Sequence, residues 1–156
     1  MAKMQHKLRH IAVSVPNVAE AQKFFEEAFG MWKAGDAGRG VYMTDGVMNV
    51  ALLDYKGAKI TGVEGDKPFY GLIHFGMWVD NLEAAEKQAI DAGAVHMHGR
   101  PPDAPNRYYE VKYRNPHGLV FDLTASGWIG AVKHVKPAEE EGSAVARRSE
   151  RELPAG

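Results

Sequence analysis

The sequence predicts an α+β fold in which two β-α-β-β-β modules join into a curved, incomplete eight-stranded barrel. The main observation behind this prediction is that the same order of strand-like and helix-like patterns occurs twice. Both copies open with a strand that carries a histidine, and an asparagine then precedes a helix. The spacing from His10 to Asn17 equals the spacing from His74 to Asn81. Such an internal repeat is typical of a fold built from two copies of one unit.

Length and composition place the chain among ordinary globular proteins. It has 156 residues, 45% hydrophobic and 25% charged, with a formal net charge of −1 and no cysteine. We expect one domain over residues 1–132, no disulfides or thiolate metal sites, and no nucleic-acid partner. No apolar run is long enough to span a bilayer, and Met1–Arg9 lacks the apolar core of a secretory signal. A cytoplasmic protein without a membrane partner is therefore expected.

The first module occupies about residues 8–55. Asn17 is the expected N-cap of its helix, Glu20 stands at the capping-box position, and Gly30 is the expected stop. Asp45-Gly46 is a hairpin signal. The expected strands are Leu8–Val15, Met31–Lys33, Arg39–Thr44 and Val47–Tyr55.

The second module, about residues 72–124, follows the polar connection Lys56–Pro68. Its helix is expected between Asn81 and Gly93, and Asn115-Pro116-His117-Gly118 is a turn signal before the last strand. The expected strands are Leu72–Val79, Ala94–His98, Arg107–Arg114 and Leu119–Thr124.

The composition changes at Lys133. Residues 133–156 contain Glu139-Glu140-Glu141 and Arg147-Arg148, but almost no large apolar side chain. This composition predicts a disordered tail that the fold and the metal site do not need.

Three side chains are the candidates for a metal site. Strand alternation places His10 and His74 on the face of the first strand of each module that points away from its helix. Asp122 lies on the equivalent face of the last strand, in an apolar stretch where a carboxylate needs a partner. If the two sheets join, the three side chains converge into a two-histidine, one-carboxylate site that suits Fe(II), Mn(II), Ni(II) or Zn(II). The alternatives are hydrogen-bonded core histidines and an aspartate that anchors an arginine.

The sequence resembles the vicinal oxygen chelate superfamily over about Leu8–Thr124. That family holds glyoxalase I, extradiol ring-cleaving dioxygenases and bleomycin- or fosfomycin-resistance proteins. The resemblance depends on the two histidine-bearing strands and on Arg114–Leu123, which is similar to the family's closing hairpin with Asp122 in place of the usual glutamate. It implies paired modules around a divalent metal that chelates two neighbouring oxygens of a small-molecule substrate, and a homodimer.

Glyoxalase-type members take a fourth protein ligand from the last strand of the first module. The matching positions here are Val50 or Leu52, so that ligand is expected to be absent, and Asp54 is a weak candidate further along the strand. A three-ligand site resembles the extradiol dioxygenases, which bind both substrate and O₂. This resemblance favours Fe(II) or Mn(II) as the cofactor.

The residue ten positions before Asp122 weighs against a dioxygenase. Those enzymes carry a tyrosine ten residues before the carboxylate ligand, where this chain has Lys112 next to Tyr113.

The loop His96–Tyr109 contains acid–base and anion-binding residue types at the expected cavity mouth. We predict four catalytic residues from it, with Arg100 as a further pocket candidate; the alternative is a solvated loop stiffened by prolines. The four are His98, Arg107, Tyr108 and Tyr109.

The other histidines and Trp78 are not candidates for the metal site. Trp78 either stacks on an aromatic substrate or fills the barrel. His6, His117 and His134 are expected to be exposed, and His96 with His98 has the spacing of an adventitious surface metal site.

The sequence leaves three functions open. The first is an extradiol-type dioxygenase, an oxidoreductase. The second is a glyoxalase I-like lyase or isomerase, and the third a non-catalytic drug-binding resistance protein, against which retention of all three candidate ligands weighs. Exposed sheet edges and the apolar pair Trp128-Ile129 add to the expectation of a homodimer.

Overall fold

The computed structural model describes residues 4–99 and 109–136. The first module contains β1 (Lys7–Ser14), α1 (Val18–Phe29), β2 (Trp32–Ala37), β3 (Gly40–Thr44) and β4 (Asn49–Leu53). The second module contains β5 (Gly71–Trp78), α2 (Leu82–Asp91), β6 (Val95–His98), β7 (Val111–Arg114) and β8 (Val120–Thr124).

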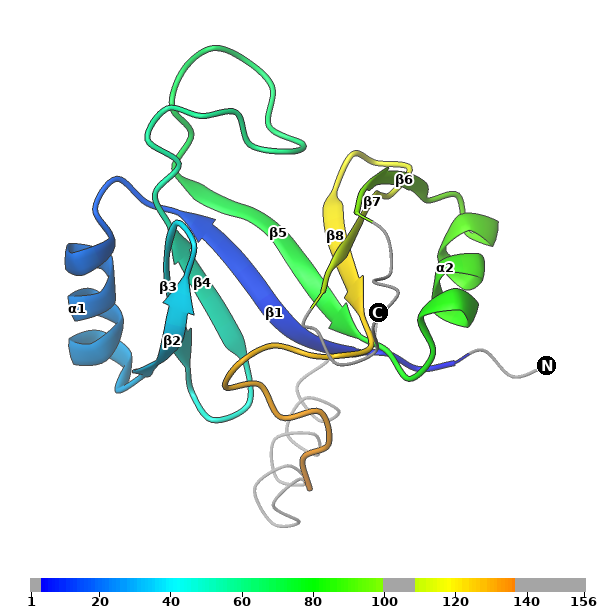
Figure 1. The fold of residues 1–156 in the computed structure, drawn as a ribbon, viewed down its shortest axis with the longest axis horizontal. Coiled ribbons are helices and arrows are strands. Elements are labelled where there is room, and N and C mark those ends of the chain that lie inside the picture. The colour runs from blue at the N-terminus through cyan, green and yellow to red at the C-terminus, as the bar shows by residue number, and fades with distance from the viewer. Residues whose placement is uncertain (1–3, 100–108, 137–156) are drawn as a thin grey trace, which may run out of the picture.

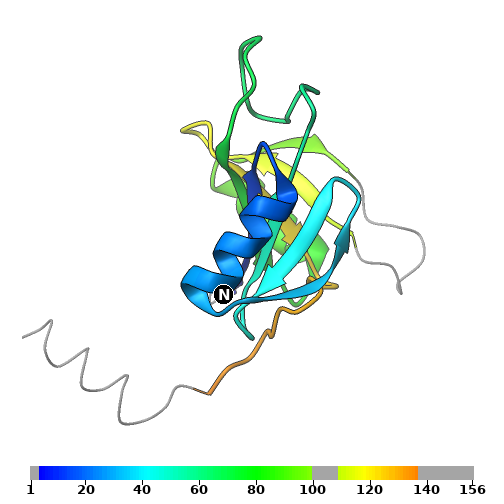
Figure 2. The ribbon, with the colours of Figure 1, turned by 90° about the vertical axis from the view of Figure 1, so that its left-hand side faces the viewer.

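The strands form one mixed sheet in the order β2-β3-β4-β1-β5-β8-β7-β6. Antiparallel pairing of β1 with β5 joins the modules, and each of these strands pairs in parallel with the last strand of its own module. The sheet curves without closing, with α1 beside the first module and α2 beside the second (Figures 1 and 2). The predicted α+β fold with an incomplete eight-stranded barrel is confirmed.

Both helices begin at the predicted asparagines. The side chain of Asn17 accepts a hydrogen bond from the backbone of Glu20, and that of Asn81 accepts one from Ala84. Gly30 ends α1 in the left-handed conformation, with φ of 64°. These local signals set where each helix begins after the first strand of its module.

Two apolar clusters lie on the helix-covered face of the sheet. In the first module Val50 and Leu52 of β4 pack with side chains of α1. In the second, Val111 and Tyr113 of β7 pack with α2, and the Tyr113 hydroxyl donates a hydrogen bond to Glu86. Alternate residues of the same strands therefore face the opposite, concave side.

Some strand boundaries differ from the sequence expectation. The second strand extends to Ala37 because pairing with β3 continues beyond Lys33. The seventh strand begins at Val111, and the expected start at Arg107 lies outside the described residues. The expected disordered tail also lies outside them beyond position 136, while the Lys133 ammonium pairs with Asp80.

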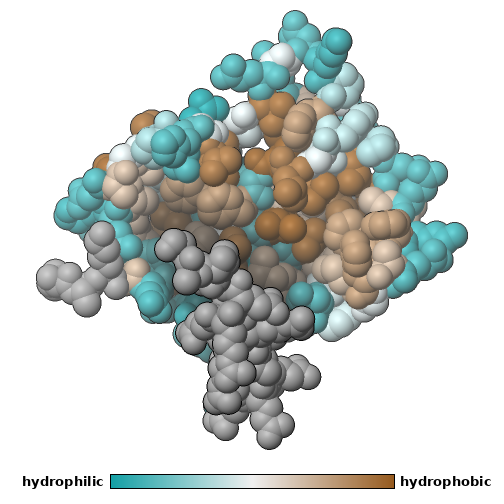
Figure 3. Space-filling view, turned by 180° about the vertical axis from the view of Figure 1, so that it is seen from behind, coloured by the Kyte–Doolittle hydropathy of each residue, from teal (hydrophilic) through white to brown (hydrophobic). Residues whose placement is uncertain are grey.

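The helices leave part of the sheet uncovered. A groove of about 310 Å³ lies beside α2 and is lined by Phe75, Met77 and Phe121 among others. Seen from behind, apolar side chains gather in the middle of the molecule (Figure 3). His6 also lines the groove and is partly buried, so the expectation that it is exposed was wrong. No helix in the described part of the chain is long and apolar enough to cross a membrane.

Candidate metal centre

The three predicted ligand side chains meet on the concave face of the sheet. His74 Nε2 lies 3.0 Å from Asp122 Oδ2, and His10 Nε2 lies 3.3 Å from His74 Nε2 and 3.9 Å from Asp122 Oδ2. All three side chains are almost completely buried, with His74 the most exposed at 7%. Within residues 4–99 and 109–136 this is the one group of three residues with metal-ligand spacing.

Strand register brings these residues together. In the β1–β5 pair His10 lies opposite Gly76 and Ala12 lies opposite His74, so the two histidines are diagonal neighbours. In the β5–β8 pair Gly76 lies opposite Asp122. All five positions share the concave face, because side chains along a strand alternate between faces.

His10 is held in the orientation and tautomer that a metal ligand needs. Its Nδ1 lies 2.7 Å from Asn49 Oδ1, an oxygen that can only accept, so Nδ1 carries the proton and donates. The lone pair of Nε2 therefore points towards His74 and Asp122. Burial lowers the pKa of His10 to about 4, so the ring is neutral at neutral pH.

Asn49 was not singled out in the sequence, although it lies directly opposite His10 in the parallel β1–β4 pair. Its Nδ2 donates to the carbonyl of Ile129, which ties the segment after β8 to the first module. Residues that hydrogen-bond a ligating histidine fix its orientation and raise its basicity.

Asp122 divides its two oxygens between different partners. Oδ1 accepts a hydrogen bond of 2.7 Å from the Lys112 ammonium, whereas Oδ2 is buried and has no hydrogen-bond partner, despite its closeness to His74. Burial opposes the charged form, but neighbouring His74 and Lys112 outweigh it and hold the pKa of Asp122 below its usual value. The cation that pairs with Asp122 is therefore Lys112, and not an arginine as in the alternative interpretation.

These residues fit a divalent cation. Two imidazole nitrogens and a buried oxygen without a hydrogen-bond partner face one another, and their ligand atoms all lie within 4.8 Å. Nitrogen and oxygen donors of this kind suit Fe(II), Mn(II), Ni(II) and Zn(II). Because Lys112 occupies Oδ1, Asp122 offers one oxygen to a metal.

The strand position from which a fourth ligand could face the centre is neither Val50 nor Leu52, the two positions expected from the sequence. Ala51 lies opposite Ala12, just as Asp122 lies opposite Gly76, so Ala51 is the residue that matches Asp122. The predicted absence of a ligand there is correct, but the predicted positions were wrong by one residue. An alanine at this place leaves room beside the histidines.

Asp54 does not belong to the centre. The face that it shares with Val50 and Leu52 packs against α1, whereas Leu53 and Tyr55 point to the concave side. Its carboxylate instead accepts a hydrogen bond from the backbone of Lys56. The weak candidacy of Asp54 as a fourth ligand was therefore wrong.

Trp128 is the largest feature of the centre that the sequence did not reveal. Its indole stacks on the His10 ring at 4.7 Å between centroids and 9° between planes. It fills the space over Gly76, where a Cβ would lie 2.5 Å from the indole. Its Nε1 donates a hydrogen bond to Glu110. Gly76 thus leaves space that the Trp128 indole fills, so this part of the strand does not form an open cavity floor.

A cavity of about 170 Å³ lies directly at the centre. Its wall includes His10, His74 and Ala51, together with Glu110 and Lys112 from the start of the seventh strand. The ammonium of Lys112 lies 3.5 Å from Glu110 Oε2. Burial and the charge of Asp122 raise the pKa of Glu110, and the two carboxylates raise that of Lys112 against the effect of burial.

A larger cavity of about 370 Å³ lies beside the first. It is lined by two of the predicted catalytic residues, His98 and Tyr109. Arg107 and Tyr108, like Arg100, lie outside the described residues. Glu110 and Lys112 were missed as pocket residues, although the turn at Asn115–Gly118 sets a hairpin register in which Lys112 lies opposite Asp122.

The other residues that the sequence singled out lie away from the centre. Trp78 packs over Gly127 and donates to the carbonyl of Ala125, so it fills space rather than facing a substrate. His117 and His134 are exposed as expected. His96 lies against Tyr113 and the Gly99 carbonyl.

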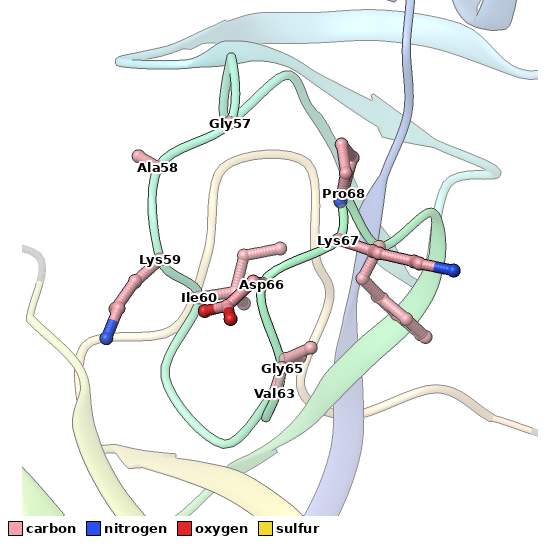
Figure 4. Close-up of a pocket in the computed structure, with 10 residues that line it drawn as sticks. Gly57, Ala58, Lys59, Ile60, Val63, Gly65, Asp66, Lys67 and Pro68 are labelled. Atoms are coloured by element: carbon pink, nitrogen blue, oxygen red, sulfur yellow. The ribbon is translucent and has the colours of Figure 1, made fainter.

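A further hollow of about 200 Å³ lies within the β4–β5 connection (Figure 4). Its wall is made by the connection itself, and Lys59 and Lys67 point in different directions away from it. With no convergent polar groups, it is not a candidate site.

We predict that Asn49→Ala weakens metal binding about 10–100-fold, the usual cost of losing a residue that orients a ligating histidine. Metal titration of the purified variant measures this. Asn17→Ala is the control, because it loses a helix cap worth about 1 kcal/mol without touching the centre. Equal metal affinity in the two variants would contradict the role of Asn49.

Residues 7–123 match the family model of the Glyoxalase/Bleomycin resistance protein/Dioxygenase superfamily. No curated protein matches the sequence at a significant level.

Three solved structures illustrate the structural likeness. The hypothetical protein BH1468 from Bacillus halodurans has a TM-score of 0.62 at 15% identity, covering 77% of this chain and 94% of that one. The methylmalonyl-CoA epimerase of Streptomyces coelicolor has 0.58 at 13%, covering 74% and 94%. The 2,3-dioxygenase LapB from Pseudomonas sp. KL28 has 0.55 at 17%, covering 85% of this chain but 44% of that one. Identities this low show a shared fold and nothing more.

Proposed function

The chain belongs to the Glyoxalase/Bleomycin resistance protein/Dioxygenase superfamily, and we propose that it is a metal-dependent, extradiol-type dioxygenase. The proposed ligands are His10, His74 and Asp122, and the proposed substrate is a small molecule with two adjacent oxygens. Fe(II) or Mn(II) is the favoured metal, because this reaction uses O₂; Ni(II) and Zn(II) suit the same donors.

One observation carries the proposal: the centre offers three ligand atoms and small residues where a fourth ligand would stand. Ala12 and Ala51 lie opposite each other on the concave face and both line the cavity. Two histidines and one carboxylate with open positions are the arrangement of non-haem Fe(II) oxygenases. A bound metal there would supply a template and Lewis acid for adjacent substrate oxygens and O₂.

The protein's own residues perform the remaining tasks. Asn49 and Trp128 hold the His10 ring, and Lys112 holds one oxygen of Asp122 so that the other faces the histidines. Glu110 and Lys112 stand at the cavity wall, where they can accept or donate a proton of the substrate. His98 and Tyr109 are proposed to contact the substrate from the larger cavity, and Arg107 and Tyr108 remain predictions.

A glyoxalase I-like lyase or isomerase is the second candidate. The observation that favours it is Glu110, a carboxylate beside the centre whose raised pKa suits a base that moves a proton. The third possibility, a resistance protein that binds a drug without turnover, has no use for three converging ligands.

Oxygen uptake by the Fe(II)-loaded protein with a panel of catechols tests the proposal. We expect O₂ consumption equal to catechol loss, with absorbance of a ring-opened product. If the protein instead converts the hemithioacetal of methylglyoxal and glutathione and consumes no O₂, the lyase replaces the dioxygenase.

We also predict a homodimer, because the groove beside Phe75, Met77 and Phe121 leaves apolar side chains uncovered in the described part of the chain. Sedimentation at micromolar concentration is the measurement, and a monomer would refute the prediction. A cytoplasmic location also remains a prediction.

A further inference from the structure

The two cavities beside the metal centre share one wall. Tyr42, Glu110 and Lys112 line both the small cavity at the histidines and the larger one next to it. A ligand that chelates the metal and extends outwards into the larger cavity must therefore pass these three side chains.

Glu110 and Lys112 are not equally available to such a ligand. The ammonium of Lys112 donates to Asp122, and its side chain is only 17% exposed. The side chain of Glu110 is 31% exposed. Trp128 donates to Oε1 of Glu110 and so fixes the carboxylate, while Oε2 lies 3.5 Å from Lys112, beyond a hydrogen bond of normal length. Glu110 lines both cavities, and Oε2 is the one of its two oxygens that Trp128 leaves available as an acceptor.

The larger cavity has walls that suit a flat, partly apolar body. Tyr42, Tyr109, Trp128 and Ile129 supply aromatic and aliphatic surface around Glu110. Aromatic rings of this kind stack on planar ligands and form cation–π contacts with ammonium groups.

We propose that Glu110 is the specificity-determining residue of this larger cavity. It selects flat, chelating substrates whose outward substituent donates a hydrogen bond or carries a positive charge, such as an ammonium or hydroxyl group, over those that carry a carboxylate. This inference rests on the proposed function, since the substrate's adjacent oxygens must be held at His10, His74 and Asp122.

The charges around the cavity support the same selection. A metal at the centre would balance the charge of Asp122, whose other oxygen pairs with Lys112. Glu110 is the carboxylate that lines the larger cavity, 3.5 Å from the Lys112 ammonium. A carboxylate arm placed beside Glu110 would meet like charge, whereas an ammonium arm would complete an ion pair.

Binding of matched probes to the Zn(II)-loaded protein tests the proposal. Zn(II) has no redox chemistry, so the probes are not consumed. The probes are dopamine, with an ammonium arm, hydrocaffeate, with a carboxylate arm, and the uncharged catechol with a propyl arm. Calorimetry gives Kd for each. We expect dopamine to bind at least about tenfold more tightly than hydrocaffeate, the scale of one hydrogen bond to a charged group.

Glu110→Gln keeps the size and the acceptor for Trp128 but removes the charge. The ratio of the two Kd values should fall towards one in this variant, and the Kd of propylcatechol, which has no charged arm, measures any general effect of the substitution on catechol binding. Glu83→Gln on the exposed side of α2 is the control and should keep the wild-type ratio. Metal content and melting temperature of each variant show that the site is intact.

The outcomes separate this inference from the proposed function. If the catechols bind and the ratio is the same in wild type and Glu110→Gln, or if hydrocaffeate binds more tightly to wild type, the role of Glu110 is overturned. If none of the three catechols binds the metal-loaded protein, the proposed function fails and the selection by Glu110 fails with it.

Discussion

His74→Ala is expected to lose stoichiometric metal while the chain still folds. In the proposed site His74 supplies one of three ligand atoms and lies 3.0 Å from Asp122 Oδ2, so its removal leaves two protein ligands, which are too few for a stable site. The loss of affinity should exceed the roughly 100-fold cost of removing a residue that only orients a ligand. Elemental analysis after metal loading and buffer exchange measures the metal content.

The control is His117→Ala, which removes an exposed histidine from the turn before β8. It should retain one metal per chain. Circular dichroism and thermal melting confirm that both variants fold. Stoichiometric metal in folded His74→Ala would remove this residue from the site.

Asp122→Asn is expected to weaken metal binding sharply, because the amide keeps the shape of the side chain but removes the anionic oxygen. Two effects coincide there: the loss of a ligand oxygen and the loss of the partner of Lys112. Asp122→Glu should retain metal but shift it relative to the cavity groups, so turnover should fall more than affinity.

Metal titrations and turnover assays of both Asp122 variants test whether Asp122 is a metal ligand. Unchanged affinity in Asp122→Asn would show that the aspartate only anchors Lys112. Lys112→Met is the companion variant, since it removes the ammonium and leaves the carboxylate. We expect Lys112→Met to keep the metal.

The convergence of His10, His74 and Asp122 could be predicted from the sequence because alternation within a strand needs no knowledge of partners. His10 and His74 each lie on a strand whose opposite face is plainly apolar, so their direction could be deduced locally. Both N-caps at Asn17 and Asn81 were predictable for the same reason, since a cap depends on the nearest three residues.

The fourth strand of the first module was harder to interpret, because all four residues from Val50 to Leu53 are apolar and alternation therefore gives no direction. Only the register of β4 against β1 shows that Ala51, rather than Val50 or Leu52, faces the centre. That register comes from tertiary pairing through a long connection, which a single sequence does not specify.

Trp128 could not be placed because it lies after the last strand, where no periodicity assigns a face. Its partner His10 lies in the first strand, and its partner Glu110 lies just before β7, so both contacts depend on the tertiary path of the segment after β8. Its apolar character suggests a dimer contact, but its side chain is buried against the centre at 6% exposure. Any dimer contact of this segment must use other side chains.

The central claim is that a metal binds through two imidazoles and one carboxylate with open positions. X-ray absorption at the metal edge of the Zn(II)-loaded protein tests it most directly, because multiple scattering counts imidazole ligands without a crystal. We predict two imidazole nitrogens at about 2.0–2.1 Å, with oxygen atoms as the remaining ligands. A spectrum with one imidazole or none would contradict it.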